Sequence, residues 1–404
     1  MFNLFANLCL SFAKFGTLTT KENITMRIEK SFTIYQDKEF FSAFPGLANL
    51  GNGHLAVAFR RAPNYQTLPG IPGDFVAHGD ALSQLMYMES FDNGETWGQP
   101  RLLASPPLGA AQDGGLLYDG KYLFANSFIW RVIPDIVKDQ LSDECNNEFF
   151  EHHLSWLVPY GSFVMRSDDG GQHWGDIVLP EALPGNIEVL PGQPRRLHNR
   201  SNLVRTPDGR LLLGGQALRY KPRYRSSIVL YSSCDNGESF QYLTTPVDDA
   251  GEGVYEEPWI YITPGGRWVI LIRCHRTVDK EESAPRARLA YVYSDDQGMT
   301  WSKPVHTDIH AEPCACCRMD DEKVLLVYGY RQSDGCGVRG RICSAEFDDI
   351  VTAEEFIIRD DGGWWDVGYP SVAPLGNNRY MVAYYMDKPE YRGASALEAS
   401  ILTL

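Results

Sequence analysis

The sequence predicts an all-β protein, a six-bladed β-propeller whose blades are four-stranded antiparallel sheets. Two repeated patterns predict this fold: an eight-residue turn motif that occurs four times, and a strand–turn–strand pattern that occurs six times. Similar antiparallel sheets arranged around one axis form a propeller, which protects its strand edges. We expect a single propeller domain over residues 27–404, preceded by an N-terminal tail.

The turn motif reads Ser-x-Asp-x-Gly-x-(Thr/Ser/His)-(Trp/Phe), and each copy follows a strand-like run. Its Asp accepts hydrogen bonds from N–H groups of the turn, and its Gly adopts a conformation that residues with a Cβ atom resist. One such octet is an ordinary turn, but four in one chain indicate a repeat about the length of a four-stranded unit. The copies are Ser90–Trp97, Ser167–Trp174, Ser233–Phe240 and Ser294–Trp301.

The second pattern is an apolar strand, a turn rich in Gly, Asp or Asn, and another apolar strand. It occurs at Phe44–Phe59, Gly114–Phe128, Ser201–Gly215, Glu257–Ile272, Cys317–Tyr330 and Tyr369–Tyr385. We expect the strand Ser31–Tyr35 to join the last blade beside Ala394–Leu404 and to close the ring. The longest insertion, residues 131–159, contains the only helix-like stretch and is expected to form a wall of the binding site.

Charge and composition exclude several function classes. The net charge of −15 argues against general nucleic-acid binding, which needs a basic surface. No run approaches the ~20 apolar residues of a membrane helix. The first 26 residues lack the basic region of a signal peptide, so a tail or a misassigned start is the preferred interpretation. Nine cysteines without disulfide-scaffold spacing, together with the weak signal-peptide pattern, favour a reducing compartment and thus the cytoplasm, with periplasmic or secreted locations left open.

A cysteine cluster, Cys314-Ala315-Cys316-Cys317 with His310 upstream, raises the question of a zinc site. Its spacing matches no common ligand motif, and alternate residues of a strand face opposite sides of the sheet. Buried free thiols are the better interpretation. We therefore expect no metal and no cofactor.

The repeats resemble those of the sialidase superfamily, whose six-bladed propellers carry the same turn motif, called the Asp box. The resemblance spans roughly Ser31 to Leu404. Asp boxes are specific for the architecture and weak for activity, because other propeller proteins carry them too. In the family they lie away from the active site, so we assign them no catalytic role.

The resemblance implies four catalytic candidates. Glu257 heads a strand of the fourth unit, as the family's catalytic Glu does, and Tyr369 heads a strand of the sixth, as the nucleophilic Tyr does. Asp80, or failing it His78, lies about ten residues before the first box, where the family has its acid/base. A Tyr with its usual pKa of ~10 is a weak nucleophile, so Glu257 would take its proton. Asp80 or His78 would protonate the leaving oxygen and then activate water.

Each candidate also has a structural interpretation. Tyr369 can be a buried strand residue, Glu257 a surface carboxylate and Asp80 a loop residue.

The resemblance also implies arginines that bind the carboxylate of a sialic acid. Arg273 follows Glu257 by 16 positions, across the turn of the fourth unit, and Arg339 lies in the matching segment of the fifth. Ala43, however, stands where sialidases have their first Arg, and an alanine cannot bind a carboxylate. Either Arg60 or Arg61 replaces that Arg, or the substrate is not a sialic acid. We favour the second interpretation.

Further binding candidates precede strands of the other units. Arg196, His198 and Arg200 could line a site for an anionic sugar such as a uronic acid, or form a solvated basic loop. In a propeller, residues at the heads of inner strands converge on the axis. The candidates of this kind are Asp113 and Asp366, and Trp365 beside Trp364 could stack on a sugar or pack between sheets.

The sequence thus favours a sialidase-like exo-glycosidase that hydrolyses a terminal, acidic sugar of a carbohydrate substrate. The alternatives are a non-catalytic carbohydrate-binding propeller and a polysaccharide lyase. The geometry of the candidates discriminates between them: an enzyme requires Glu257 within hydrogen-bond reach of the Tyr369 hydroxyl, with Asp80 or His78 nearby.

Overall fold

The structure is a computed structural model. It describes residues 26–71, 78–106, 109–134, 136, 150–152, 155–184, 188–190, 193–219, 225–248, 253–276, 287–320, 322–363, 365–387 and 394–404. The predicted N-terminal tail, much of the insertion at 131–159, and Trp364 lie outside these residues.

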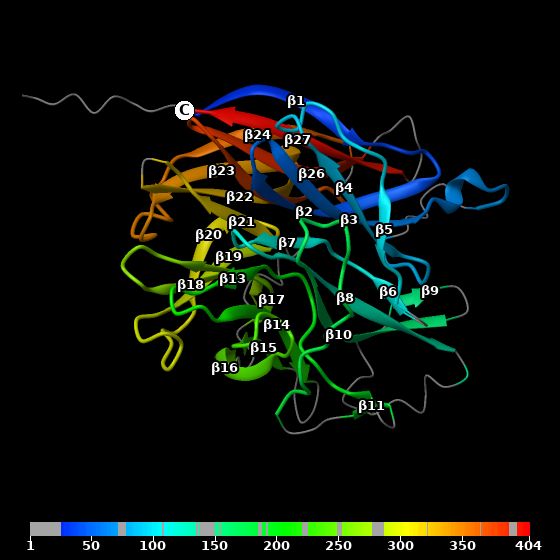
Figure 1. Cartoon of the computed structure of the whole chain (residues 1–404), viewed down its shortest axis with the longest axis horizontal. Helices are drawn as coiled ribbons and strands as arrows, with labels where there is room; N and C mark the ends of the chain where they lie inside the picture. The colour runs from blue at the N-terminus through cyan, green and yellow to red at the C-terminus, as the bar shows by residue number, and fades with distance from the viewer. Residues whose placement is uncertain are drawn as a thin grey trace, which may run out of the picture.

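The described strands form six main sheets, one for each predicted blade (Figure 1). Blade one is β2 (Phe40–Gly51), β3 (His54–Pro63), β4 (Gln84–Ser90) and β5 (Arg101–Ala104). Blade two is β6 (Gly109–Ala111) and β7 (Gly115–Tyr118), then β8 (Leu123–Pro134), β10 (Ser155–Ser167) and β9 (Phe150–His152). Blade three is β13 (Leu203–Arg205), β14 (Leu211–Arg219), β15 (Arg225–Ser233) and β16 (Gln241–Asp248).

The remaining blades have the same antiparallel order. Blade four is β17 (Gly253–Ile262), β18 (Trp268–Arg276), β19 (Arg288–Ser294) and β20 (Val305–His310). Blade five is β21 (Cys314–Arg318), β22 (Lys323–Gln332), β23 (Gly335–Ser344) and β24 (Glu355–Gly362). Blade six is β25 (Gly368–Gly376), β26 (Arg379–Asp387), β27 (Ser395–Thr403) and β1 (Arg27–Tyr35). A small ribbon pairs β11 (Glu188–Leu190) with β12 (Gln193–Pro194), and Tyr65–Thr67 form the short 3-10 helix η1.

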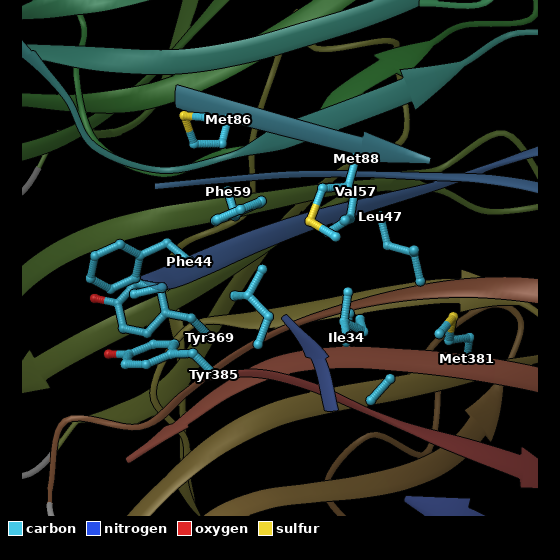
Figure 2. Packing of buried hydrophobic residues seen from close by; sticks show 14 of the residues in the cluster. Ile34, Phe44, Leu47, Val57, Phe59, Met86, Met88, Tyr369, Met381 and Tyr385 are labelled. Carbon is cyan, nitrogen blue, oxygen red and sulfur yellow. The ribbon is translucent and has the colours of Figure 1, made fainter. Parts of the chain in front are cut away.

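The ring closes in blade six, as the sequence predicts. Strand β1, near the N-terminus, pairs antiparallel with β27 at the C-terminus, from Arg27 opposite Thr403 to Tyr35 opposite Leu397. An apolar core fills the space between this blade and blade one (Figure 2). Its burial supplies the hydrophobic stabilisation that holds first and last blades together.

The Asp boxes form the turns that the motif predicts. In the first box the Ser90 hydroxyl accepts from the Gly94 N–H at 2.9 Å, and Asp92 accepts from the Thr96 N–H at 2.9 Å. The other three boxes repeat these bonds. Hydrogen bonds from Thr96 and Ser90 lower the pKa of Asp92 to about 2, so its carboxylate is ionised at neutral pH.

Most of the helix-like stretch, residues 135–157, lies outside the described residues, and its described C-terminal part is strand. Phe150–His152 form β9, and from Ser155 onward the chain is β10, which pairs with β8 as far as Ser167. A local helical pattern is a weak preference, and the long backbone pairing with β8 overrides it. Within the described residues, no helix is long and apolar enough to cross a membrane.

Candidate functional site

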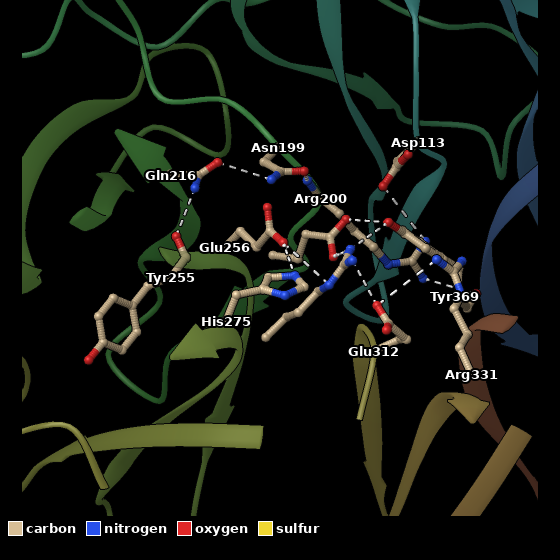
Figure 3. A network of polar contacts seen from close by, with 12 residues as sticks. Asp113, Asn199, Arg200, Gln216, Tyr255, Glu256, His275, Glu312, Arg331 and Tyr369 are labelled. Atoms are coloured by element: carbon tan, nitrogen blue, oxygen red, sulfur yellow. Dashed lines mark hydrogen bonds and ion pairs between the residues drawn. The ribbon is translucent and has the colours of Figure 1, made fainter. Parts of the chain in front are cut away.

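Polar side chains from five blades meet where the innermost strands begin (Figure 3). Blade two contributes Asp113, blade three Arg200, and blade six Tyr369. Blades four and five contribute Glu256, Glu257, Arg273, Glu312 and Arg331. We call these eight residues the axial cluster. The eight residues come from seven different strands or loops, so only closure of the ring brings them together.

Tyr369 and Glu257 form the central pair of the axial cluster. The Tyr369 hydroxyl donates a hydrogen bond of 2.6 Å to Glu257 Oε1. Arg273 Nη1 donates to Glu257 Oε2 at 2.8 Å and to the Tyr369 hydroxyl at 3.1 Å. Both Tyr369 and Glu257 are only 5% exposed. The two residues therefore have the contact that the sequence analysis required of an enzyme.

The backbone explains how these two side chains reach the axis. Glu257 and Tyr369 have φ angles of +54° and +48°, a left-handed conformation that non-glycine residues rarely adopt. Each precedes a proline, Pro258 or Pro370, and each lies at an irregularity in the pairing of its strand. Such irregularities re-aim a side chain. Strained backbone of this kind costs about 1–3 kcal/mol per residue and is concentrated at functional sites.

Arg273 is surrounded by three carboxylates. Besides Glu257, its Nε lies 3.3 Å from Glu256 Oε1, and its Nη2 lies 2.8 Å from Glu312 Oε2. Burial alone would raise the pKa of Glu256, but Arg273 and His275 lower it to about 2. Glu256 is thus ionised beside Arg273. The positive charge of Arg273 is already balanced by carboxylates of the protein, so this guanidinium is not available for a substrate carboxylate.

In the central pair the effect of burial is not overcome, and the net pKa shifts are upward. Burial raises the pKa of Glu257, because Glu256 adds to the cost of a second charge and Arg273 offsets only part of it. Burial and the nearby Glu257 also raise the pKa of Tyr369 well above its usual range. At rest the phenol therefore keeps its proton, and a carboxylate with a raised pKa is a stronger base for accepting it.

Arg331 is a member of the cluster that the sequence analysis missed. It lies on β22, with its guanidinium 5.3 Å from the centre of the Tyr369 ring. Its Nε donates to the Val367 carbonyl at 3.0 Å, and its Nη2 donates to the Tyr385 hydroxyl at 3.1 Å and to Asp366 at 3.4 Å. The resemblance pointed to Arg339 in the same blade instead.

Glu312 was also missed, although the sequence carried a signal for it. Glu312-Pro313 comes directly before the inner strand of blade five, Tyr369-Pro370 lies at the start of β25, and Glu257-Pro258 lies within β17. In this chain, a charged or aromatic residue that precedes a proline at or near an inner strand places its side chain at the propeller axis.

His78, Asp366 and Trp365 lie beside the axial cluster, on a side that opens to solvent. His78 Nδ1 lies 2.8 Å from Asp366 Oδ2, and Asp366 is also bonded by Tyr385. The His78 side chain is 31% exposed and Trp365 is 51% exposed, whereas Asp366 is buried. The Phe44 ring contacts both His78, at 5.5 Å, and Tyr369, at 4.7 Å between ring centres. The phenylalanine therefore links the two catalytic candidates.

Asp80 lies in a different environment from His78. It is completely buried, and its Oδ1 accepts from the Leu82 N–H at 2.7 Å. Burial and the neighbouring Asp80 carboxylate raise the pKa of Tyr65 to about 12. Asp80 is also the acid with the largest electrostatic effect on Arg60. The Asp80 side chain therefore lies in the protein interior, where these neighbours hold it.

Arg200 connects the inner strands at the axis. Its Nη2 donates to the backbone carbonyls of Pro45, Tyr369 and Pro370, at 3.2, 3.4 and 3.0 Å. Asp113 lies 4.0 Å from Arg200 Nη1. Burial raises the pKa of Asp113 to about 7 even though Arg200 opposes this shift. The Arg200 guanidinium, which also lies 5.3 Å from the centre of the Tyr369 ring, thus supports the position of Tyr369.

Three other predicted binding residues do not join these contacts. Arg196 donates to the backbone carbonyls of Pro180 and Pro194. His198 is buried with its backbone paired to Gln216, and burial lowers its pKa to about 3. Arg339 stacks on the Tyr330 ring, with the guanidinium 4.3 Å from the ring centre. The roles first expected for them remain predictions that this geometry does not favour.

Neither candidate replacement for the arginine missing at Ala43 is exposed to a ligand at the cluster. Arg60 is completely buried and donates to the Ser83 hydroxyl at 2.8 Å. Burial lowers its pKa to about 10, against the opposing effect of Asp80. Arg61 stacks on Phe40, 4.3 Å from the ring centre.

Comparisons with known proteins agree with this architecture. A family model described as the BNR/Asp-box repeat matches residues 292–303, which include the whole fourth box. No curated protein matches the chain. The chain therefore carries BNR/Asp-box repeats on a propeller of the sialidase-like type.

Solved structures of the same fold cover nearly the whole chain. A protein of unknown function from Dyadobacter fermentans is 29% identical with a TM-score of 0.82, over 94% of this chain and 99% of that one. The NanB sialidase from Streptococcus pneumoniae is 12% identical with a TM-score of 0.59, over 93% and 70%. The α-L-arabinofuranosidase arb93a from Fusarium graminearum is 10% identical with a TM-score of 0.59, over 92% and 98%. The last two likenesses concern the fold alone.

Proposed function

We propose that this sialidase-like propeller is an exo-glycosidase that removes a terminal, uncharged sugar from a glycan. The observation that carries the proposal is the 2.6 Å hydrogen bond from the buried Tyr369 hydroxyl to Glu257, with Arg273 bonded to both. Two of the structures with this fold are glycosidases by name, a sialidase and an arabinofuranosidase. Fold alone does not determine an activity, so the proposal depends on the site.

The pair supports nucleophilic catalysis by Tyr369. As the Tyr369 oxygen attacks the anomeric carbon, Glu257 takes the phenol proton and the bond to the leaving oxygen breaks. Arg273 bonds to the phenol oxygen and stabilises the negative charge that develops there. In the second step water releases the sugar, and Glu257 returns the proton to Tyr369. Burial of the pair makes these electrostatic effects stronger than they would be in water.

The charges around the pair support an uncharged sugar, in place of the acidic sugar expected from the sequence. Arg273 contacts three carboxylates, and Arg331 lies near two, Glu312 at 4.0 Å and Asp366 at 3.4 Å. Arg200 is bonded to three backbone carbonyls. An anionic substrate would have to displace these partners and leave buried carboxylates unpaired, which is costly. Arg273 and Arg331 therefore neutralise carboxylates of the protein and are not available to bind a carboxylate of the substrate.

The test is a panel of neutral and acidic aryl glycosides, offered to the wild type, to Glu257→Gln and to a matched control, Glu89→Gln. Glu89 is a carboxylate of β4 that pairs with His54 and Arg101 at the Asp-box end of blade one. Release of one neutral sugar by wild type and Glu89→Gln, with a loss of about 10³-fold or more in Glu257→Gln, is the expected result.

Three results would contradict the proposal. Hydrolysis of acidic glycosides alone would refute the argument from charge. A folded wild type that binds glycans without cleaving any glycoside would establish a carbohydrate-binding propeller. Formation of unsaturated products from a uronic acid polymer would establish a lyase.

A further inference from the structure

We infer that His78, held by Asp366, is the acid/base of this site, and that Asp80 is not. The inference rests on the proposed glycosidase function and assigns the group that protonates the leaving oxygen. Sialidase-like resemblance points to the aspartate of the His78-Gly79-Asp80 segment, so the assignment runs against it.

Exposure separates the two candidates. The His78 side chain is 31% exposed and lies beside the exposed Trp365, with ring centres 6.0 Å apart. Asp80 is 0% exposed, and one of its oxygens is already bonded to the Leu82 N–H. A general acid must come within hydrogen-bond reach of the oxygen that it protonates. Asp80 would have to leave its buried position to meet this condition, whereas His78 already faces solvent next to a ring suited to sugar stacking.

The partner of His78 orients the imidazole for this task. Nδ1 lies 2.8 Å from Asp366 Oδ2, so Nε2, on the other side of the ring, faces away from this carboxylate. Burial alone would raise the pKa of Asp366, but His78, Arg331 and Tyr385 hold it below its usual range. The carboxylate therefore stays ionised. An ionised carboxylate at Nδ1 fixes the ring's orientation and leaves Nε2 as the nitrogen that can face a substrate.

The same contacts place His78 near the nucleophile. Phe44 packs against both the His78 ring and the Tyr369 ring. Arg331 joins the two halves of the site from the other side, because it bonds to Asp366 and its guanidinium lies over the Tyr369 ring. A sugar whose anomeric carbon meets the Tyr369 oxygen would thus have its leaving oxygen on the side of His78 and Trp365.

The proton balance of the step is complete. In the first half, the Nε2 proton of His78 passes to the glycosidic oxygen as that oxygen leaves the anomeric carbon, and the aglycone departs as a neutral alcohol. In the second half, neutral Nε2 takes a proton from the water that attacks the anomeric carbon. The imidazolium is restored, and no co-reactant besides water is needed. Asp366 remains ionised throughout and acts as a positioning residue.

Leaving-group dependence tests the assignment. For the sugar found by the glycoside panel, kcat/KM is measured with a 2,4-dinitrophenyl leaving group, which departs without protonation, and with an unsubstituted phenyl group, which requires it. The variants are His78→Asn, Asp366→Asn and Asp80→Asn, with His54→Asn as the control. His54 is a second histidine bonded to a carboxylate, Glu89 at 3.0 Å, at the Asp-box end of blade one.

His78→Asn should lose about 10²- to 10⁴-fold on the phenyl glycoside and less than about tenfold on the dinitrophenyl glycoside. Loss of the base should slow the second step, so kcat for the dinitrophenyl glycoside should fall even though kcat/KM does not, and azide should raise this kcat because it replaces the water that Nε2 would activate. Asp366→Asn should show the same selective loss for the phenyl leaving group, and His54→Asn should match the wild type.

Other outcomes would overturn the assignment without touching the proposed function. A selective loss on the phenyl glycoside in Asp80→Asn but not in His78→Asn would return the role to Asp80. Equal losses on both leaving groups in His78→Asn would make His78 a structural residue. If the wild type hydrolyses no glycoside at all, the proposed function fails first, and the two failures are thereby distinguished.

Discussion

Glu257 and Tyr369 share a left-handed backbone conformation, and their side chains are hydrogen-bonded across the axis of the propeller. Phe44 has the same conformation in blade one, with φ of +57°, and also precedes a proline. Three inner strands therefore share this backbone strain, and in blades four and six it occurs at the residues of our proposed catalytic pair. Because rigid strands hold both residues, the pair is organised before any substrate arrives.

Tyr369→Phe should abolish turnover while the protein stays folded. The variant removes the nucleophilic oxygen and leaves the ring packed against Phe44, so we expect a loss of about 10³-fold or more in kcat/KM. The double variant with Glu257→Gln should be no worse than the poorer single variant, because the two residues act as one unit. Steady-state kinetics on the panel's best substrate measures both effects. Additive losses would mean that the two residues act independently.

Arg331→Lys should impair activity, and Arg339→Lys should not. A lysine keeps the charge but cannot bond at once to the Val367 carbonyl, Asp366 and Tyr385, as the guanidinium does. Because Arg331 also lies over the Tyr369 ring, the resulting misplacement should cost roughly 10²-fold in kcat/KM. Arg339 stacks on Tyr330 instead.

The two lysine variants are compared at equal folded fraction, checked by circular dichroism. If Arg339→Lys shows the larger loss, Arg339 has the substrate-binding role that the sialidase resemblance implies, and Arg331 is not needed to position Tyr369.

The fold could be predicted because its signals are local. Each Asp box makes its defining hydrogen bonds within eight residues, so the sequence contains the complete turn. The pairing of β1 with β27 was predictable for a related reason: a ring has one seam, and the terminal strands must close it.

The site was predictable only in part, because its decisive contacts join different blades. The resemblance identified Tyr369, Glu257 and Arg273, which lie together. It missed Arg331, whose importance depends on Asp366 and Tyr385 of blade six. The burial of Asp80 could not be predicted either. It depends on neighbours such as Arg60 of β3, and no local sequence pattern around Asp80 indicates this contact.

Gly298→Ala, in the fourth Asp box, should destabilise the propeller more than Gly266→Ala. Both glycines have left-handed backbones, with φ of +87° and +88°. A Cβ at Gly298 would lie 2.9 Å from the buried Trp268 ring, whereas a Cβ at Gly266 meets nothing within 4 Å. We expect about 1 kcal/mol for Gly266→Ala from the backbone alone, and about 2–4 kcal/mol for Gly298→Ala with the added clash. Urea unfolding measures the difference, and equal losses would show that packing against Trp268 contributes nothing.

Asp113→Asn should flatten the dependence of stability on pH between about pH 4 and pH 7. Burial raises the pKa of the folded Asp113 to about 7, whereas an unfolded aspartate has a pKa of about 3.9. In this window the folded protein keeps a proton that the unfolded chain has released. The contribution of Asp113 to stability is therefore fully present below about pH 4 and is lost as the pH rises towards 7.

For one such proton the slope reaches about 1.4 kcal/mol per pH unit. An asparagine cannot titrate, so its variant should lack this slope in urea unfolding measured from pH 4 to pH 8. Asp168→Asn serves as the control, because its side chain is 66% exposed. If Asp113→Asn and the wild type have parallel profiles, Asp113 is ionised in the folded protein. The carboxylate would then form a true ion pair with Arg200 at the axis, and the negative charge around Tyr369 would be one unit larger than we infer.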